Sequence, residues 1–185
     1  MIFIKQKIKF LYWFGQWIRK SNSVSDPTKW LQIISDKLSL HFLKKLEKKL
    51  VKNRKFCKKI FNLYEYKIWL LIQHADSIPS LQNSYLSLFK LFGKNKSYIA
   101  HLEDRVLVNY KGVQKYGTQI VMGLDYHHYL IPIIGLDTFQ ILDSLQIKSL
   151  NQRRASMNLE PIEEYIDSLE KTSGIFLRTE ILKIK

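Results

Sequence analysis

The sequence has few cysteines, glycines and prolines, and each shortage excludes a class of protein. A single cysteine, Cys57, in 185 residues excludes an internal disulfide framework and a four-cysteine zinc site. Seven glycines and four prolines exclude collagen-like and linker-like chains. We expect instead a globular protein with a buried core, because 46% of the residues are hydrophobic and 13% are aromatic.

Acidic residues are scarce in the first third of the chain. Residues 1–67 carry 17 basic and 4 acidic side chains, whereas residues 68–185 carry 13 and 12. Only 6 of the 30 basic residues are arginine, which is the residue best suited to bidentate contacts with bases and phosphates. The composition therefore argues against sequence-specific recognition of nucleic acid. Two interpretations of the basic third stay open: a solvated lysine surface, or a surface for a membrane or another polyanion.

A long hydrophobic run is also missing near the N-terminus. The apolar stretch 10–18 has nine residues and is interrupted by Gln16, whereas a transmembrane helix needs about 20 apolar residues. Its short apolar core and basic flanks also differ from a signal peptide, so we expect a cytoplasmic protein. Aromatic and basic residues are mixed throughout segment 1–25. This mixture predicts either a segment that packs on the rest of the domain or one that makes peripheral contact with a membrane.

Hydrophobic residues recur at helical spacing through most of the remaining chain, which predicts a mainly α fold. We expect a single helical domain over residues 26–175 and a C-terminal tail over 176–185. The spacing predicts helices at about 27–52, 54–74, 97–109, 147–157 and 161–173. Between about 118 and 133 the period changes to that of extended chain. Residues 118–122 and 126–133 flank Gly123, Leu124 and Asp125, which predicts a small β-hairpin.

Local signals mark a further helix and the buried face of the first long one. Asp76 or Ser77 is expected to cap a helix that ends at Gly93. The inward-facing residues of the helix 27–52 are expected to be Leu31, Ile34, Leu38, Leu43, Leu46 and Leu50.

A polar cluster directly follows the most apolar predicted helix. Polar groups at the end of a buried helix either form a satisfied structural network or belong to a site, because an unpartnered group costs a few kcal/mol. His74 is a candidate general acid or base, since the reference pKa of histidine lies near 6.5. Asp76 could orient His74 only where the chain bends between them. Their structural alternatives are a histidine bonded to the backbone and a helix N-cap.

A second polar cluster surrounds the start of the predicted hairpin. It comprises Asp104, Arg105, Gly112, Gln114, Tyr116, Gly117, Thr118 and Gln119. Gly117 allows a backbone conformation that turns N–H groups toward an anion, and Arg105 could supply a counter-charge. The structural alternative is that the glycines make turns and that Asp104 and Arg105 are solvated or paired. Arg153 and Arg154 could clamp an anion or form ion pairs at the domain surface.

No motif for a nucleotide, dinucleotide, metalloprotease or hydrolase site occurs in the sequence. His127 and His128 are adjacent in a predicted strand and therefore face opposite ways. A metal set that combines one of them with His74, Asp76 and Asp104 is the alternative. We expect no metal and no cofactor.

In these clusters the chain resembles a family of bacterial domains of unknown function. The family pattern is a hydrophobic helix ending in W-L-x-x-Q-H-A-D, then Asp-Arg-Val, then G-x-Q-x-Y-G-T-Q, and a later arginine-containing helix. The corresponding segments here are 69–76, 104–106, 112–119, and Arg153 and Arg154 followed by 159–165, and Gln82 also fits. The resemblance covers about residues 65–170 and implies that the two clusters belong together. Upstream the chain departs from the pattern, because a lysine-rich helix stands where the family has acidic and Gly-Trp-Pro-like elements.

These residues predict one of two functions. The first is an enzyme that acts on a small anionic or amide-bearing substrate, with His74 as acid or base, Asp76 or Asp104 orienting it, and Arg105 stabilising charge. The binding residues of this site would be Gln73, Gln82, Gln114, Tyr116, Gly117, Thr118, Gln119, Arg153 and Arg154. The alternative is a non-catalytic domain that binds a peptide, a small molecule or a partner protein. In that case the lysine-rich residues 1–67 would contact a membrane or polyanion.

Overall fold

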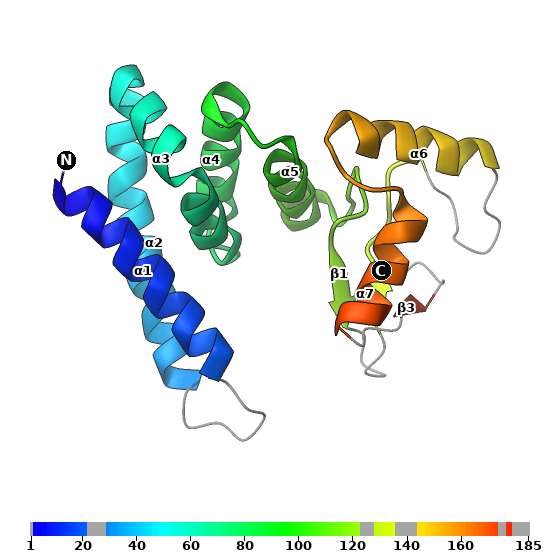
Figure 1. Ribbon diagram of the computed structural model, residues 1–185, viewed down its shortest axis with the longest axis horizontal. Helices are drawn as coiled ribbons and strands as arrows, with labels where there is room; N and C mark the ends of the chain where they lie inside the picture. The colour runs from blue at the N-terminus through cyan, green and yellow to red at the C-terminus, as the bar shows by residue number, and fades with distance from the viewer. Residues whose placement is uncertain (1, 22–28, 123–127, 136–143, 174–176, 179–185) are drawn as a thin grey trace. The chain divides into compact units, whose positions relative to one another are not determined.

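The computed structural model describes residues 2–21, 29–122, 128–135, 144–173 and 177–178 (Figure 1). Seven helices account for 77% of these residues, and a small antiparallel hairpin follows late in the chain. The mainly α fold and the late hairpin are therefore confirmed. The chain divides into two compact units, Met1–Lys94 and Asn95–Lys185, which we describe separately. The segment boundaries expected at residues 25 and 175 stay predictions.

The first unit contains four helices. They are α1 (Ile2–Ser21), α2 (Lys29–Lys52), α3 (Arg54–Gln73) and α4 (Pro79–Phe92). Helix α1 packs against both α2 and α3, and α4 packs against α3 and α2. The completely buried side chains include Ile8, Leu11, Ile18, Leu43, Leu46, Phe61, Ile68, Ile72, Tyr85 and Phe89. One face of the N-terminal helix thus packs on the rest of the unit. This agrees with the first of the two interpretations of segment 1–25, in which the segment packs on the rest of the domain.

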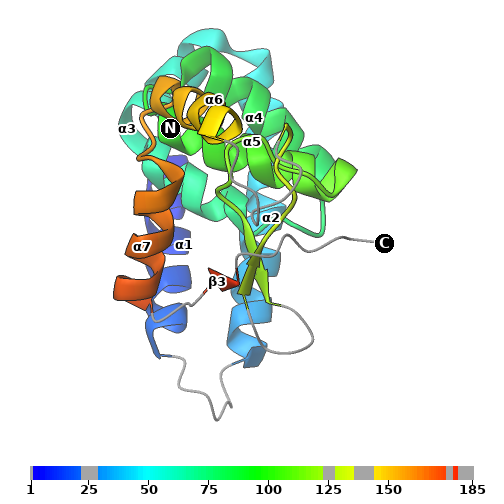
Figure 2. The same cartoon turned by 90° about the vertical axis from the view of Figure 1, so that its right-hand side faces the viewer.

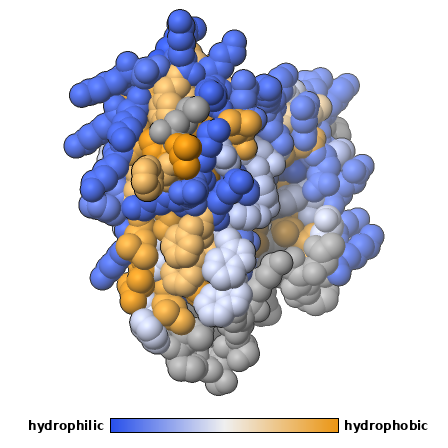
Figure 3. Space-filling view, turned by 60° about the vertical axis from the view of Figure 1, so that its left-hand side comes forward, coloured by the Kyte–Doolittle hydropathy of each residue, from blue (hydrophilic) through white to orange (hydrophobic). Residues whose placement is uncertain are grey.

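The buried face of α2 differs from the prediction in the first half of the helix. Leu43, Leu46 and Leu50 are buried as expected. Figure 3 shows hydrophobic side chains on the surface of this unit. Ile34 and Leu38 are 40% and 46% exposed, and two serines, Ser35 and Ser39, are buried in their place. The reason is the close approach of α1, because a Cβ atom on Gly15 would lie 3.5 Å from the Ser35 Oγ. Only small side chains fit between helices at that separation.

Helix ends follow the local signals in part. The Asn53 side chain caps α3 by accepting a hydrogen bond from the Phe56 N–H. The expected cap of α4 at Asp76 or Ser77 is wrong, because Ile78 occupies the N-cap position and makes no side-chain cap hydrogen bond. Gly93 does end α4, but with extended backbone rather than the left-handed conformation that favours glycine.

The second unit combines three helices with a small sheet. The helices are α5 (Lys96–Lys111), α6 (Ser144–Ser156) and α7 (Ile162–Ser173), and the strands are β1 (Ile120–Met122), β2 (His128–Leu130) and β3 (Leu177–Arg178). Strand β1 pairs antiparallel with β2, and β2 pairs in parallel with β3 (Figure 2). The core of this unit is formed by Leu130, Ile133, Leu150 and Ile162. Strand β3 lies in the segment expected to be a tail, and the predicted turn at 123–125, like His127, lies outside the described residues.

Candidate functional site

The first predicted cluster lies where α3 turns into α4. Gln73 is the last residue of α3, and His74 follows as its C-cap with φ −91° and ψ 14°, so the chain leaves the helix before Asp76. Gln82 on α4 is completely buried. Its side-chain amide donates to the Ile72 carbonyl at 3.2 Å and to the Asp76 carboxylate at 2.9 Å. Gln82 therefore satisfies the end of α3 and links it to α4, which is a structural role.

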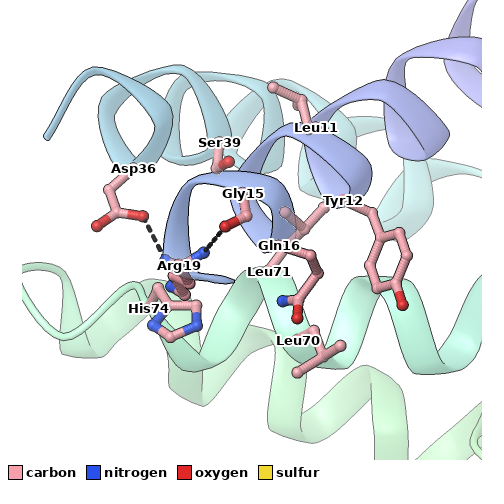
Figure 4. Close-up of a pocket in the computed structure, with 10 residues that line it drawn as sticks. All are labelled: Leu11, Tyr12, Gly15, Gln16, Arg19, Asp36, Ser39, Leu70, Leu71 and His74. Atoms are coloured by element: carbon pink, nitrogen blue, oxygen red, sulfur yellow. Dashed lines mark hydrogen bonds and ion pairs between the residues drawn. The ribbon is translucent and has the colours of Figure 1, made fainter. Parts of the chain in front are cut away.

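His74 lines a small cavity inside the first unit (Figure 4). The lining residues come from α1, α2, α3 and its C-cap: Leu11, Tyr12, Gly15, Gln16, Arg19, Asp36, Ser39, Leu70, Leu71 and His74. The cavity volume is about 10 Å³, which is about the space that one water molecule requires. A small-molecule substrate does not fit beside His74 in this conformation.

An ion pair that the sequence analysis missed lies beside His74. Arg19 on α1 donates to the Asp36 carboxylate on α2 at 2.7 Å and to the Gly15 carbonyl at 3.1 Å. Burial raises the pKa of Asp36, while the charge and the hydrogen bond of Arg19 oppose this rise. No local pattern could have predicted the pairing, because Arg19 and Asp36 lie 17 residues apart on different helices and meet only when these helices pack.

The second predicted cluster is centred on Asp104, which is completely buried on α5. Its carboxylate accepts hydrogen bonds from the backbone N–H groups of Lys115 at 2.7 Å, Tyr116 at 3.0 Å and Thr118 at 3.0 Å. The Thr118 hydroxyl donates a further bond at 2.9 Å. Burial raises the pKa of Asp104, and these hydrogen bonds act in the opposite direction. The predicted nest of N–H groups is thus present, and the anion that it holds is the protein's own carboxylate.

Gly117 adopts the left-handed conformation that this nest requires, with φ +74°. It also lies against two core side chains. A Cβ atom at this position would approach the Ile133 Cδ1 to 2.9 Å and the Ile162 Cδ1 to 3.1 Å. The absence of a side chain is therefore needed both for the backbone conformation and for the packing of the second core.

Gln114 holds the same loop against the segment that directly follows β2. It is completely buried, and its amide nitrogen donates to the carbonyls of Gln119 at 3.0 Å and Ile131 at 2.7 Å. Its side-chain oxygen accepts from the Gln119 N–H at 2.7 Å. The side chain of Gln119 in turn donates to the Thr118 hydroxyl at 3.1 Å. Both glutamines thus bond within the protein.

Arg154 is 1% exposed and contacts the backbone of the same loop. Its guanidinium donates to the carbonyls of Tyr116 and Glu160, each at 2.6 Å, and lies 5.0 Å from the centre of the Tyr165 ring. Burial lowers the pKa of Arg154. Asp104 and Arg154 therefore hold the same short loop, one through its N–H groups and the other through its carbonyls.

The remaining predicted residues of the second unit lie around this network. The Tyr116 hydroxyl donates to the Glu103 carboxylate at 3.0 Å, and burial together with Glu103 raises the pKa of Tyr116. Arg153 donates to the Ile134 carbonyl at 2.9 Å, and its buried Nε has no hydrogen-bond partner among the described residues. Arg105 is half-buried on α5, next to Asp104.

His101 is a titratable residue of this network that the sequence analysis missed. Burial, together with the charges of Arg154 and Arg105, lowers the pKa of His101 to about 4. His101 is therefore uncharged at neutral pH. Its spacing could have revealed it, because His101 lies three residues before Asp104 and hence on the same side of α5.

The predicted site residues thus fall into two groups, one in each unit. In the first unit Asp76 and Gln82 are in contact, with Gln73 and His74 at the end of the same helix. In the second unit the structure brings together Asp104, Gln114, Tyr116, Gly117, Thr118, Gln119 and Arg154. That the two groups form one shared site stays a prediction. Within the described part of the chain, no group of three or more His, Cys, Asp or Glu side chains could hold a metal ion.

Comparisons with protein-family models, curated proteins and solved structures found no match to this chain. The resemblance to the bacterial family stays a prediction. Arguments about function therefore rest on the residues and the geometry of the two units.

The two units differ sharply in charge. The first unit contains 19 basic and 5 acidic residues, whereas the second contains 11 of each. The exposed lysines of the first unit are concentrated on the second half of α2 and the first half of α3: Lys44, Lys45, Lys48, Lys49, Lys52, Lys55, Lys58 and Lys59. Among the described residues, no helix combines the length and the apolar character needed to cross a membrane.

Proposed function

We propose that this chain is a non-catalytic binding protein that attaches to an anionic membrane surface through its first unit. The observation that carries the proposal is the charge distribution, because the entire net charge of +14 belongs to Met1–Lys94 and the second unit is neutral. Each lysine near an anionic bilayer contributes about 1 kcal/mol of attraction. The exposed lysines of α2 and α3 are therefore sufficient for a substantial affinity.

The contacts of the predicted catalytic residues favour this alternative over an enzyme. Asp104 accepts hydrogen bonds from its own loop, so its carboxylate oxygens are engaged inside the protein. The cavity beside His74 has room for about one water molecule. Both clusters are better explained as supports for the fold than as a substrate pocket.

Two features favour a membrane over a nucleic acid as the anionic partner. Lysine outnumbers arginine 24 to 6, and arginine is the residue typical of base and phosphate recognition. The same unit also exposes tryptophans, with Trp13 at 59% and Trp17 at 50%. Tryptophan is enriched where proteins meet the headgroup region of a bilayer.

The proposal is tested by sedimentation with phospholipid vesicles. The full chain should bind vesicles that contain phosphatidylserine, bind phosphatidylcholine vesicles weakly, and lose affinity as salt is added. The triple variant Lys45→Gln, Lys49→Gln, Lys55→Gln should lose about fivefold in affinity per lysine. A matched triple variant of exposed lysines in the second unit, Lys111→Gln, Lys148→Gln, Lys171→Gln, should bind as the unchanged protein does.

Two results would contradict the proposal. The first is equal binding to anionic and neutral vesicles. The second is binding of a fluorescent oligonucleotide with no binding of anionic vesicles, which would identify a nucleic acid as the partner of the basic surface.

A further inference from the structure

Most of the large apolar side chains in the first half of α2 are exposed. Trp30, Ile33 and Ile34 are 58%, 55% and 40% exposed, while Ser35 and Ser39 are buried. The usual arrangement of an amphipathic helix is the reverse, with apolar residues inside and serines in water. Packing against α1 explains why small residues face inward, but it does not explain why large apolar residues face outward.

Helix α1 also has an apolar face that points away from its own unit. Ile8, Leu11 and Ile18 make up its buried face. A second face carries Trp13 and Trp17, which are 59% and 50% exposed. The rings of these two tryptophans are stacked with their centres 6.1 Å apart, so the exposed face is ordered as a row of aromatic rings.

The exposed faces of α1 and α2 belong to the same end of a helical hairpin. Arg19 contacts Asp36 at 2.7 Å, and Gly15 lies against Ser35, so the second half of α1 runs beside the first half of α2. We call the exposed side chains at this end the hairpin surface: Trp13, Trp17, Trp30, Ile33, Ile34 and Leu38. Figure 3 shows hydrophobic side chains gathered on this part of the unit and hydrophilic ones crowded along the opposite, upper border.

We infer that the hairpin surface inserts into the boundary between headgroups and acyl chains of an anionic membrane. This inference rests on the function proposed above and adds the part of the protein that enters the lipid. Three of the four tryptophans of the chain lie on this surface. Tryptophan rings, which combine a large apolar body with one polar N–H, are suited to the membrane boundary.

The outward face of α2 is suited to contact with one surface along its length. Leu38, Lys45 and Lys52 follow one another at seven-residue intervals, which is two helical turns, so they lie on the same side of the helix. The exposed residues of this face are mostly apolar up to Leu38, with Lys37 among them, and mostly lysines from Lys44 onward. A helix that lies along an anionic bilayer would bury the apolar half and place the lysines against the headgroups.

Charge also decides between a membrane and a second copy of the chain. Two copies that met at the hairpin surface would bring two units of like charge together, because each first unit has 19 basic and 5 acidic residues. Like charges at an interface oppose association. An anionic lipid surface has the complementary charge, so it is the occupant that we assign.

Insertion is tested with tryptophan fluorescence in the full chain. The variant Trp69→Phe leaves tryptophans at positions 13, 17 and 30, all of them on the hairpin surface. On phosphatidylserine-containing vesicles its emission should shift to the blue and should be quenched by phospholipids brominated on the acyl chains. Emission that is unchanged by vesicles to which the protein is bound would overturn the inference.

A matched pair of variants in the Trp69→Phe background tests whether the apolar side chains provide affinity. Ile33→Gln, Ile34→Gln, Leu38→Gln changes the hairpin surface and keeps its tryptophans as reporters. It should lose at least about tenfold in vesicle affinity and most of the quenching. Val51→Gln, Leu63→Gln, Leu91→Gln changes exposed apolar residues of the same unit outside that surface and should change neither. Circular dichroism compares the folds of the two.

The outcomes separate this inference from the proposed function. Salt-sensitive vesicle binding that is equal in the two variants and shows no quenching would overturn insertion and leave attachment by lysines in place. Failure of the unchanged chain to bind anionic vesicles would overturn both. Self-association without lipid that disappears in the hairpin-surface variant would assign the surface to a second copy and overturn insertion.

Discussion

At the scale of single residues, Gly117 is the position where backbone conformation and packing impose the same requirement. Its φ of +74° strains any residue that carries a side chain, and a Cβ atom would lie 2.9 Å from the Ile133 Cδ1. Gly135 provides a matched control, because it has φ +77° and a Cβ atom there would lie 3.7 Å from the Arg153 Nη1, which is an ordinary van der Waals distance. A side chain at Gly117 is therefore opposed by both the backbone conformation and the lack of space, whereas a side chain at Gly135 is opposed by the backbone conformation alone.

We predict that Gly117→Ala lowers the free energy of unfolding by about 2–4 kcal/mol, from backbone strain of about 1 kcal/mol and overpacking of about 1–3 kcal/mol. Gly135→Ala should show the strain contribution alone, about 1 kcal/mol. Denaturant unfolding of the three proteins measures both values. Equal losses in the two variants would show that Ile133 and Ile162 move aside without cost.

His101 should make stability depend on pH. Its pKa is lowered from 6.5 to about 4 in the folded chain, mainly by burial. As pH falls from 6.5 toward 4 the unfolded chain binds a proton that the folded chain does not bind, so the free energy of unfolding decreases. Above pH 6.5 both states are uncharged at this residue and the effect is absent. The decrease should reach about 3 kcal/mol at the acid end of this window.

The variant His101→Gln should lack this contribution. As pH falls from 6.5 toward 4, its free energy of unfolding should therefore rise relative to that of the unchanged protein. An NMR titration of the His101 ring measures the pKa directly. A value close to 6.5 would contradict the prediction.

At the scale of elements, Asp104 fixes the connection that leaves α5 for the hairpin. Three backbone N–H groups and one hydroxyl donate to its carboxylate. In Asp104→Asn the amide nitrogen would face a donor, such as the Thr118 N–H. We predict a loss of about 1–3 kcal/mol in the free energy of unfolding, the cost of leaving a buried donor unpaired. Asp167→Asn on the exposed side of α7 should change stability by less than about 0.5 kcal/mol, and an equal loss in both would contradict the prediction.

The contact between α1 and α2 contains a polar group with no partner among the described residues. The Ser35 Oγ is buried and makes no hydrogen bond there. We predict that Ser35→Ala raises the free energy of unfolding by about 1 kcal/mol, because it removes the buried hydroxyl and improves helix propensity. Ser39 lines the small cavity, and Ser39→Ala should raise the free energy of unfolding by less. Thermal unfolding compares the two, and destabilisation by Ser35→Ala would show that its hydroxyl is bonded in solution.

Elements that depend on local signals could be predicted from the sequence, and those that depend on distant partners could not. The start of α3 follows from its N-cap Asn53 and the end of α5 follows from its C-cap Gly112, because each of these residues affects only backbone groups a few positions away. The prediction of the inward face of α2 was wrong at Ile34 and Leu38, because hydrophobic spacing does not reveal how closely α1 approaches. Strand β3 was missed, because a two-residue strand has no pattern of its own and depends on pairing with β2.

The same limit applies to the candidate site. The group from Gln114 to Gln119 could be predicted because its members are neighbours in sequence. What they bind could not be predicted, since a nest for an external anion and a nest for Asp104 require the same glycine and the same loop. Likewise, Arg19 and Asp36 meet beside His74 only through the packing of three helices.

At the scale of the whole molecule, charge and exposed apolar surface are both concentrated in the first unit. Nineteen basic residues and the hairpin surface belong to Met1–Lys94, while the second unit is neutral and has most of its predicted polar residues bonded within the network around Asp104. Attraction by lysines is screened within about 10 Å at moderate ionic strength, whereas apolar insertion is not. The two contributions to membrane attachment therefore respond differently to salt.

We predict that the affinity of the full chain for phosphatidylserine-containing vesicles falls as salt is raised and then levels off above zero. The decrease in affinity with salt measures the contribution of the lysines. The affinity that remains at high salt, the level part, measures the contribution of the hairpin surface. The variant Ile33→Gln, Ile34→Gln, Leu38→Gln should lose the level part and keep the slope, whereas Lys45→Gln, Lys49→Gln, Lys55→Gln should reduce the slope and keep the level part. A salt series of vesicle sedimentation measures both. Complete release of the unchanged protein at high salt would mean that lysines alone hold it to the membrane, because screened charges leave no other attraction.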